Sequence, residues 1–436
     1  MSTLWKKKHT TSDPAVNKYI ISKNLEADNV LFPFDIEASI AHTNMLAKVG
    51  LINQEEKKDL VLELNNLKIA HANGEFKLEQ QNEDMHTAIE NYLTQTLGQT
   101  GKKIHTARSR NDQVLVATRL FSKKKLKETK IKILKLSQNI LNFAQKHKTI
   151  PMPGYTHTQQ AMPSSVGQWA SSFSESLLDD FKIISTAYKL NDQNPLGSAA
   201  GFGSTLPIDR NQTTKELKFS KLQINPIYCQ NSRGKIESFT ITALLQVMET
   251  LSKIANDLVW FTSQEFNFFN VKQSLTTGSS IMPQKRNLDI MEVLRANTSI
   301  VHSYQIQTQT VSKNLISGYN KDLKITKKAL IDSINITLDS ISIVDLLFKN
   351  IEPNTDTLIG NMSPEIFATD LVNQLVADGV PFREAYQTIG NNLNTLSKQN
   401  YDSNIKSSTH LGSTGNLGIE ILQKEIDQLY HSIQNK

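Results

Sequence analysis

The stretch Thr276-Thr277-Gly278-Ser279-Ser280-Ile281-Met282-Pro283-Gln284-Lys285-Arg286-Asn287 is denser in chemically active groups than any other part of the chain. Threonines, serines and a glycine do not sustain a helix cheaply, and Pro283 has no backbone N–H to donate. The stretch is therefore predicted to be a loop that can close over a ligand. Lys285 and Asn287 lie at its exit and are suited to holding an anion. From composition alone, a plain surface linker is the commoner explanation of such a loop.

On both sides of this loop, apolar residues recur every three or four positions, which is the spacing of long packed helices. The two cleanest series are Leu244, Val247, Leu251, Ile254, Leu258 and Phe261, and Leu330, Ile334, Thr337, Ile341, Val344 and Phe348. Earlier segments, at 131–143 and 166–181, also carry broad apolar faces. These apolar helix faces together present more surface than the bundle of one chain can bury, so self-association is predicted.

The chain has 436 residues, more than one domain usually holds. We predict an all-α fold with a long-helix bundle at 106–353, flanked by smaller helical domains at 1–105 and 354–436. Residues 82–90 are expected to open a helix, where Glu83 and Asp84 serve either as caps or as ligands. Residues 101–113 are expected to form a polar loop. The glycine run at 197–203 follows no β-branched strand, so it is predicted to be a turn and not a dinucleotide site.

Composition excludes several classes of protein. The net charge of +6 comes from scattered lysines, so it does not predict nucleic-acid binding, and an anionic small molecule explains it equally well. The single cysteine, Cys229, excludes an intramolecular disulfide and a multi-cysteine metal site, and a buried thiol is expected. With no secretory signal and no run of about 18 apolar residues, we expect no membrane partner and a cytoplasmic location.

Three polar stretches interrupt the helical pattern: 105–113 (HTARSRNDQ), 152–159 (MPGYTHTQ) and the opening loop. The loop's wording, GSSxMPxKxN, resembles the signature loop of the fumarase/aspartase superfamily. With the other two stretches, the chain resembles the argininosuccinate lyase branch of that superfamily over about residues 4 to 390. The resemblance implies a fumarase/aspartase-like fold and a carbon-nitrogen lyase that splits argininosuccinate into L-arginine and fumarate, the last step of arginine biosynthesis. It also implies no metal or organic cofactor, and a homotetramer whose subunits share each active site.

The resemblance assigns roles to particular residues. Ser279 takes the proton from carbon, and His157 donates one to the departing nitrogen. Glu292 orients the histidine ring, while Lys285 stabilises the charge that develops on a carboxylate. The direction of proton transfer between Ser279 and His157 stays open. Ser109, Asn111 and Thr156 are assigned to the succinyl carboxylates, Asn287 shares the charge-stabilising role of Lys285, and Arg108 is assigned to substrate binding.

For the arginine end of the substrate, the resemblance points to Asp84, Tyr319 and Lys327. The chain departs from the family at Asn24, where serine is usual, and at Lys324, where glutamine is usual. Lys324 favours a carboxylate and disfavours a guanidinium. Two alternatives therefore stay open: a lyase acting on another N-substituted aspartate, such as adenylosuccinate, and a non-catalytic structural paralogue. Retention of the four catalytic candidates argues against the second.

Overall fold

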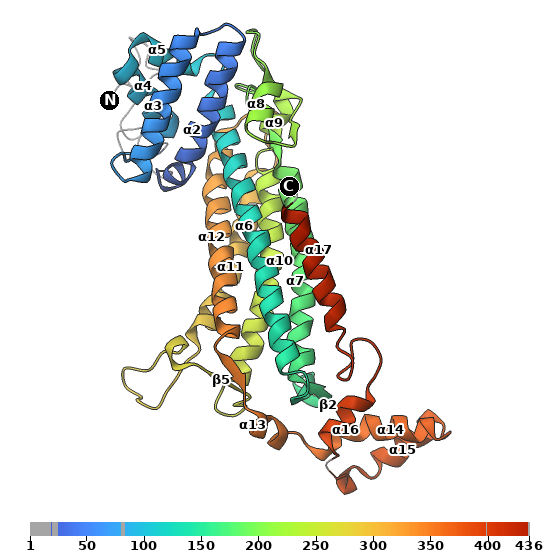
Figure 1. Cartoon of the computed structure of the whole chain (residues 1–436). Helices are drawn as coiled ribbons and strands as arrows, with labels where there is room; N and C mark the ends of the chain where they lie inside the picture. The colour runs from blue at the N-terminus through green and yellow to red at the C-terminus, as the bar shows by residue number, and fades with distance from the viewer. Residues whose placement is uncertain (1–18, 20–24, 80–82, 398, 435–436) are drawn as a thin grey trace. The chain divides into compact units, whose positions relative to one another are not determined.

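The computed structural model describes residues 19, 25–79, 83–397 and 399–434. They form two compact units (Figure 1). The first unit is Met1–Glu128, Ile184–Leu245 and Ile300–Asn335, and the second is Thr129–Ile183, Gln246–Ser299 and Ile336–Lys436. Helices dominate both units, which confirms the all-α prediction. In the part of the chain that the structure describes, no helix is both long and apolar enough to cross a membrane.

Several long helices continue from one unit into the other. They are α6 (Arg110–Lys146), α7 (Val166–Asn191), α10 (Lys235–Phe261), α11 (Asp289–Val311) and α12 (Thr326–Phe348). The two heptad series lie within α10 and α12 as predicted, and Leu251 and Ile334 are fully buried. Burying each such side chain contributes about 1.5 to 3 kcal/mol. Because the boundaries between the units fall inside these helices, the three-domain division stays a prediction.

The first unit also contains the N-terminal helices and a segment of short elements. Their bounds are α2 (Leu25–Lys48), α3 (Gln54–Ala72), α4 (Met85–Leu97), α5 (Gln99–Lys102), η1 (Lys103–His105), β3 (Gln193–Asn194), α8 (Arg210–Glu216), β4 (Lys221–Leu222), α9 (Pro226–Asn231) and η3 (Lys321–Ile325). Strands β3 and β4 pair in parallel. The glycine run at 197–203 forms turns, as predicted.

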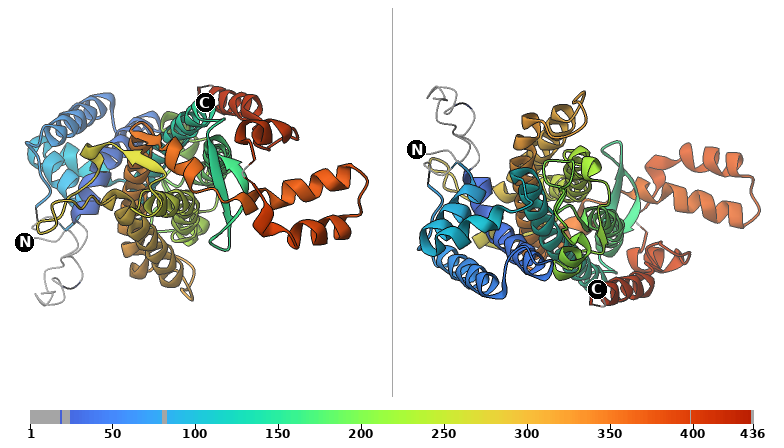
Figure 2. Two further views of the ribbon diagram at one scale, coloured as in Figure 1. Left: turned by 90° about the horizontal axis from the view of Figure 1, so that it is seen from below. Right: turned by 90° about the horizontal axis from the view of Figure 1, so that it is seen from above.

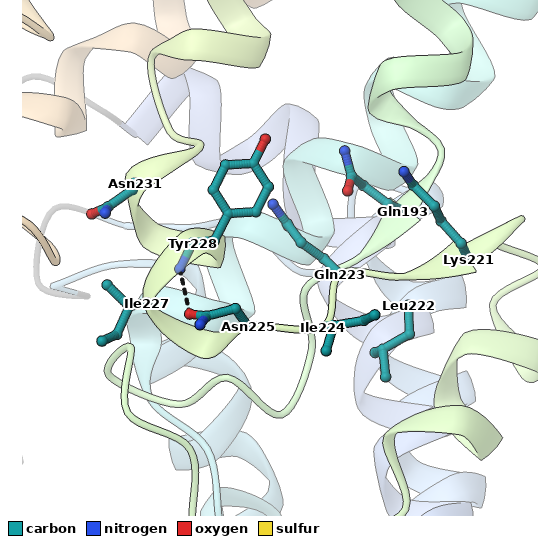
Figure 3. A pocket seen from close by; sticks show the side chains of 9 residues that line it. All are labelled: Gln193, Lys221, Leu222, Gln223, Ile224, Asn225, Ile227, Tyr228 and Asn231. Carbon is teal, nitrogen blue, oxygen red and sulfur yellow. Dashed lines mark hydrogen bonds between the residues drawn. The ribbon is translucent and has the colours of Figure 1, made fainter.

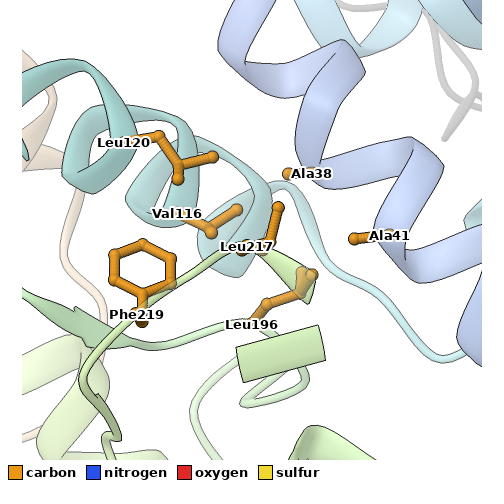
Figure 4. Packing of buried hydrophobic residues seen from close by; sticks show 7 residues of the cluster. All are labelled: Ala38, Ala41, Val116, Leu120, Leu196, Leu217 and Phe219. Atoms are coloured by element: carbon orange, nitrogen blue, oxygen red, sulfur yellow. The ribbon is translucent and has the colours of Figure 1, made fainter. Parts of the chain in front are cut away.

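A hydrophobic cluster holds the start of α6 in place (Figure 4). Its members are Ala38 and Ala41 of α2, Val116 and Leu120 of α6, and Leu196, Leu217 and Phe219. All are buried, and Phe34 packs against them. The cluster fixes the first turns of α6 against α2 and the 196–219 segment, and therefore positions the polar stretch that precedes α6.

The expectation of a polar loop over the whole of 101–113 is wrong. The chain forms α5 and η1 first, and α6 already begins at Arg110. Ser109 precedes the helix: its Oγ accepts from Asn111 N at 3.3 Å, and its own N–H donates to Asp112 Oδ1 at 2.9 Å. This is close to a capping box, although Ser109 Oγ accepts from the second helical residue and not from the third, and the Ser-x-x-Asp spacing was a readable signal for a helix start.

The second unit carries the remaining elements. They are β1 (Pro151–Thr156), β2 (Gln159–Ser165), β5 (Phe269–Val271), η2 (Gln273–Leu275), β6 (Ile351–Pro353), α13 (Thr355–Gly360), η4 (Pro364–Phe367), α14 (Ala368–Ala377), α15 (Phe382–Gly390), η5 (Leu393–Thr395), α16 (Tyr401–Ser407) and α17 (Ile419–Gln434). Its long-helix segments are joined by hydrogen bonds as well as apolar packing, for example Trp169 Nε1 to Asp257 Oδ2 at 3.0 Å. The α14–α15 pair projects away from them (Figure 2).

The β1–β2 hairpin was not predicted. Its two-residue turn is His157-Thr158, and both residues have positive φ, 54° and 62°. Such turns usually contain asparagine, aspartate or glycine, so nothing in the residue types at this position announced a hairpin. The turn presents His157 at an exposed tip.

Candidate active site

A pocket of about 220 Å³ in the first unit gathers most of the charged groups predicted for the arginine end of a substrate. It is lined by Asp28, Glu83, Asp84, His86, Arg110, Asn111, Val114, Arg233, Tyr319, Lys321, Lys324 and Lys327. Five of these residues were candidates from the sequence: Asp84, Asn111, Tyr319, Lys324 and Lys327. The pocket therefore joins the start of α4, the first turn of α6 and the segment that leads into α12.

One side of the pocket is acidic. Asp84 caps α4 by accepting from Thr87 N at 2.8 Å, so one residue serves both of the roles left open by the sequence. Arg110 Nη1 lies 2.8 Å from Glu83 Oε1 and 3.2 Å from Asp84 Oδ2. Burial raises the pKa of Asp84, but the nearby charges of His86 and Arg110 outweigh it and lower the pKa overall. Asp84 is therefore a carboxylate at neutral pH.

The other side of the pocket is rich in cations. Lys327 forms a buried ion pair with Asp28, and the guanidinium of Arg233 lies 4.7 Å above the centre of the Tyr319 ring. Burial, followed by the charges of Lys327 and Lys321, lowers the pKa of Lys324. A pocket with an acidic and a cationic side suits a ligand that carries a cationic group at one end and a carboxylate at the other.

A buried histidine–aspartate pair at this pocket was missed by the sequence analysis. His86 Nδ1 lies 2.7 Å from Asp35 Oδ2, and both side chains are buried. Burial lowers the pKa of His86, but Asp35 and Asp84 outweigh it and raise the pKa overall. A carboxylate only accepts hydrogen bonds, so Nδ1 holds a proton. Asp35 lies 51 residues upstream within a helix, where no local pattern marks it as a partner.

The 105–111 stretch does not present all its candidates to the pocket. Arg108 is buried, and its Nη1 donates to Ser39 Oγ of α2 at 2.9 Å. Burial lowers the pKa of Arg108. The hydroxyl of Ser109 caps α6, while Asn111 lines the pocket.

Asp112 anchors this stretch to the turn at 197–199. Its Oδ2 accepts from Gly197 N at 2.9 Å and from Ala199 N at 3.0 Å, while its Oδ1 accepts from Ser109 N. The side chain is fully buried. One carboxylate therefore fixes two polar stretches that are distant in sequence.

The opening loop lies in the second unit and is a loop, as predicted. Its base is closed by Thr277 and Asn287, whose backbones exchange hydrogen bonds of 3.0 and 2.8 Å. Ser279 Oγ accepts from Ile281 N at 3.3 Å and from Met282 N at 3.1 Å. Lys285 is exposed near the loop's exit.

The remaining candidates also belong to the second unit, except Asn24, which lies outside the described residues. Thr156 and His157 are exposed at the tip of the β1–β2 hairpin, and Glu292 is exposed on α11. Within this unit, the 276–287 loop and the hairpin extend on different sides of the long helices (Figures 1 and 2). Among the described residues, no hydrogen bond joins Ser279 to His157.

A larger hollow in the first unit lacks comparable chemistry (Figure 3). It has a volume of about 560 Å³ and is lined by Gln193, Lys221, Leu222, Gln223, Ile224, Asn225, Ile227, Tyr228 and Asn231. Asn225 Oδ1 accepts from Tyr228 N at 3.0 Å and so caps α9. Apart from one ammonium and one phenol, the lining offers amides and aliphatic groups. The smaller charged pocket is therefore the candidate binding site.

Comparisons with known proteins agree with this architecture. A family model described as "Lyase" matches residues 8–302. Argininosuccinate lyase of Thermotoga neapolitana is 41% identical over 386 residues, which cover 88% of this chain and 97% of that protein. The enzyme of the same name from Sorangium cellulosum is 38% identical over 98% of both chains.

Solved structures share the fold at lower sequence identity. EDDS lyase in complex with formate has a TM-score of 0.82 at 20% identity and covers 98% of this chain and 93% of its own. Fumarate lyase from Mesorhizobium sp. BNC1 has a TM-score of 0.71 at 15% identity and covers 95% and 94%. The solved structures establish the fold alone, and the sequence relatives establish the family. The chain belongs to the argininosuccinate lyase family and has the helical fold of the fumarase/aspartase superfamily.

Proposed function

We propose that the chain is a carbon-nitrogen lyase that reversibly splits argininosuccinate into L-arginine and fumarate. The observation that carries the proposal is the pocket with one acidic and one cationic side, in a chain that belongs to this family. Glu83 and Asp84 suit a guanidinium, while Lys324 suits a carboxylate. Placing both ends of an arginine in one pocket leaves the succinyl group to be held by the remaining candidates.

The reaction requires a proton to leave a carbon beside a carboxylate, which is a very weak acid. Ser279 takes that proton, the C–N bond breaks, a C=C bond forms, and His157 supplies a proton to the departing nitrogen. Lys285 and Asn287 stabilise the charge that spreads into the carboxylate. Glu292 orients the histidine ring. The order of proton transfer between Ser279 and His157 stays open, as in the sequence analysis.

Serine is a weak base unless its alkoxide is stabilised. Two backbone N–H groups, those of Ile281 and Met282, already donate to Ser279 Oγ and support the assignment. Donors fixed in this way lower the free energy of an oxyanion more than that of a neutral hydroxyl. The loop therefore supplies part of the activation that a lone serine lacks.

We further propose that each active site is built from several subunits of a homotetramer. The 276–287 loop and the β1–β2 hairpin extend on different sides of the long helices of one unit, which supports a site that a second copy completes. The surplus of apolar helix seams supports assembly as well. The predicted cytoplasmic location stays a prediction.

Fumarate release distinguishes the possible activities. Its absorbance in the ultraviolet is followed with argininosuccinate and then with adenylosuccinate as substrate. Fumarate from argininosuccinate alone supports the proposal. Fumarate from adenylosuccinate alone supports a lyase of different substrate choice, and fumarate from neither supports a non-catalytic paralogue.

Mixing of variants tests the shared site. His157→Asn and Ser279→Ala are each expected to abolish turnover as pure assemblies. Dissociating and reassociating the two variants together should restore up to about a quarter of the parent's activity, because some sites then combine an intact His157 with an intact Ser279. If the mixture stays as inactive as its components while native mass spectrometry, with one variant isotopically labelled, shows that mixed tetramers form, each site lies within one subunit.

A further inference from the structure

Arg233 was not a candidate from the sequence, yet it lines the charged pocket. It lies in the turn between α9 and α10. The next residue, Gly234, has φ +77°, and a Cβ there would come within 1.9 Å of Ser312 Oγ. Only glycine allows the chain to turn this tightly against its neighbour. The backbone conformation that positions Arg233 is therefore built into the fold.

The guanidinium of Arg233 is buried, and among the described residues it forms no ion pair: Glu237, four residues further along the chain, acts on its charge but lies beyond ion-pair distance. The residue is 8% exposed, and among the described residues none accepts a hydrogen bond from its Nη1, which is closed off from solvent. Its recorded contact is the face of the Tyr319 ring. By contrast, Arg110 in the same pocket pairs with Glu83 and Asp84.

Burying an unpaired charge is costly, and arginine is seldom buried unless it is paired. Burial lowers the pKa of Arg233, and the electrostatic influence of the Tyr319 hydroxyl and of Glu237 offsets only part of that effect. A cation over an aromatic ring recovers only about 0.5 to 2 kcal/mol. The most direct explanation of this position is an anion that arrives with the ligand.

We infer that Arg233 is a specificity-determining residue that binds the α-carboxylate of the arginine end of the substrate. The guanidinium fork matches a carboxylate with two parallel hydrogen bonds, and the Tyr319 ring holds the fork in one plane. Lys321 and Lys324 line the same pocket and add positive charge. Glu83 and Asp84 take the ligand's guanidinium instead, so the two ends are sorted by charge. This inference rests on the proposed function and names the group that recognises the amino-acid end.

Calorimetric titration with L-arginine and with agmatine tests the inference, because agmatine differs only by lacking the α-carboxylate. The parent should bind arginine more tightly than agmatine. Arg233→Gln should weaken arginine binding by about 10- to 100-fold, the scale of one lost charged hydrogen-bonding group. Its binding of agmatine should change by less than about threefold. Arg233→Lys, which keeps the charge without the fork, should lie between the parent and Arg233→Gln.

A matched control is Arg119→Gln, since Arg119 is also buried but lies outside the pocket lining and donates to Ser232 Oγ. Its preference for arginine over agmatine should equal the parent's. If Arg233→Gln does not fold, Arg233→Lys still decides the question, because the inference requires its preference to fall below the parent's. Titration with inorganic phosphate distinguishes a general anion site from a carboxylate site. If Arg233→Gln weakens the binding of phosphate but leaves the binding of arginine unchanged, the inference is overturned.

Equal weakening of both ligands in Arg233→Gln, or an unchanged preference, also overturns it. The proposed function is judged separately, by fumarate release from argininosuccinate in the parent. If the parent releases fumarate and Arg233→Gln still prefers arginine over agmatine, the proposed function stands and this inference is overturned. A parent that shows the preference but releases no fumarate loses the function.

Discussion

Asp84 illustrates how one side chain serves the fold and the site together. It caps α4 through Thr87 and faces a pocket in which Arg110 and His86 hold it ionised. A cap usually contributes about 1 kcal/mol, and the same negative charge is available to a cationic ligand. The two explanations that the sequence left open for this residue are therefore compatible.

Lys285 gives the clearest prediction for catalysis. Lys285→Ala should reduce kcat by about 100- to 1000-fold, because the ammonium is expected to stabilise the oxyanion that forms in the transition state. Steady-state fumarate release measures the effect. Arg286→Ala is the matched control: it removes the neighbouring exposed cation of the same loop and should stay within a factor of about three. A Lys285→Ala enzyme within that same factor would exclude the assigned role.

The sequence predicted the site residues that belong to recognisable motifs, but not those whose role depends only on their contacts in the folded chain. Asp84, Tyr319 and Lys327 were predicted from their phrases, and they share the pocket. Arg233 was missed because its significance lies in being buried without a partner. Asp35 was missed because its contact with His86 spans 51 residues.

At the scale of elements, Asp112 is predicted to hold the first turn of α6 to the 197–199 turn. Asp112→Asn replaces one accepting oxygen by an NH₂ group that opposes backbone donors, so buried N–H groups lose their acceptor. We expect a loss of about 1 to 3 kcal/mol in stability and a higher KM. Thermal unfolding at one fixed scan rate measures the first, with the exposed Asp179→Asn as control. Equal melting temperatures for parent and Asp112→Asn would show that the anchor is dispensable.

The hairpin that carries His157 makes a second prediction at this scale. Thr158 is β-branched and has φ 62°, a conformation that costs about 1 to 3 kcal/mol for most residues. Thr158→Asn tolerates positive φ and should raise the melting temperature while fumarate release stays within about threefold. Thr158→Val retains the β-branch and should not stabilise. If both variants melt alike, the turn is not strained at this residue.

These elements also show where prediction from sequence ends. The seams of α10 and α12 were predictable because a helix repeats its apolar face every few residues over a long segment. The β1–β2 hairpin was not, because two short strands with prolines and an unusual turn leave no such repeat. The helix cap at Ser109 could have been predicted from the Ser-x-x-Asp spacing, yet the density of polar residues around it favoured a loop.

The stability of the folded protein should depend on pH through Asp180, a buried residue of α7. Its side chain is 4% exposed, and among the described residues none donates to its Oδ2. Burial, with a smaller effect from the charge of Asp179, raises its pKa to about 6, although a hydrogen bond from Thr250 opposes the shift. The folded protein therefore holds this proton to higher pH than the unfolded chain, whose carboxyl titrates near 3.8.

A group whose pKa is raised by folding contributes stability that is complete below the unfolded value and lost as pH rises through the folded value. Asp180 should therefore cost the parent stability above pH 6, on the order of 1 to 3 kcal/mol. Asp180→Asn cannot ionise and should melt at a higher temperature than the parent at pH 7.5, with the difference shrinking toward pH 4.5. Melting curves at both pH values, with the exposed Asp378→Asn as control, measure it. A constant difference across that range would show that the ionisation of Asp180 does not set the pH dependence of stability.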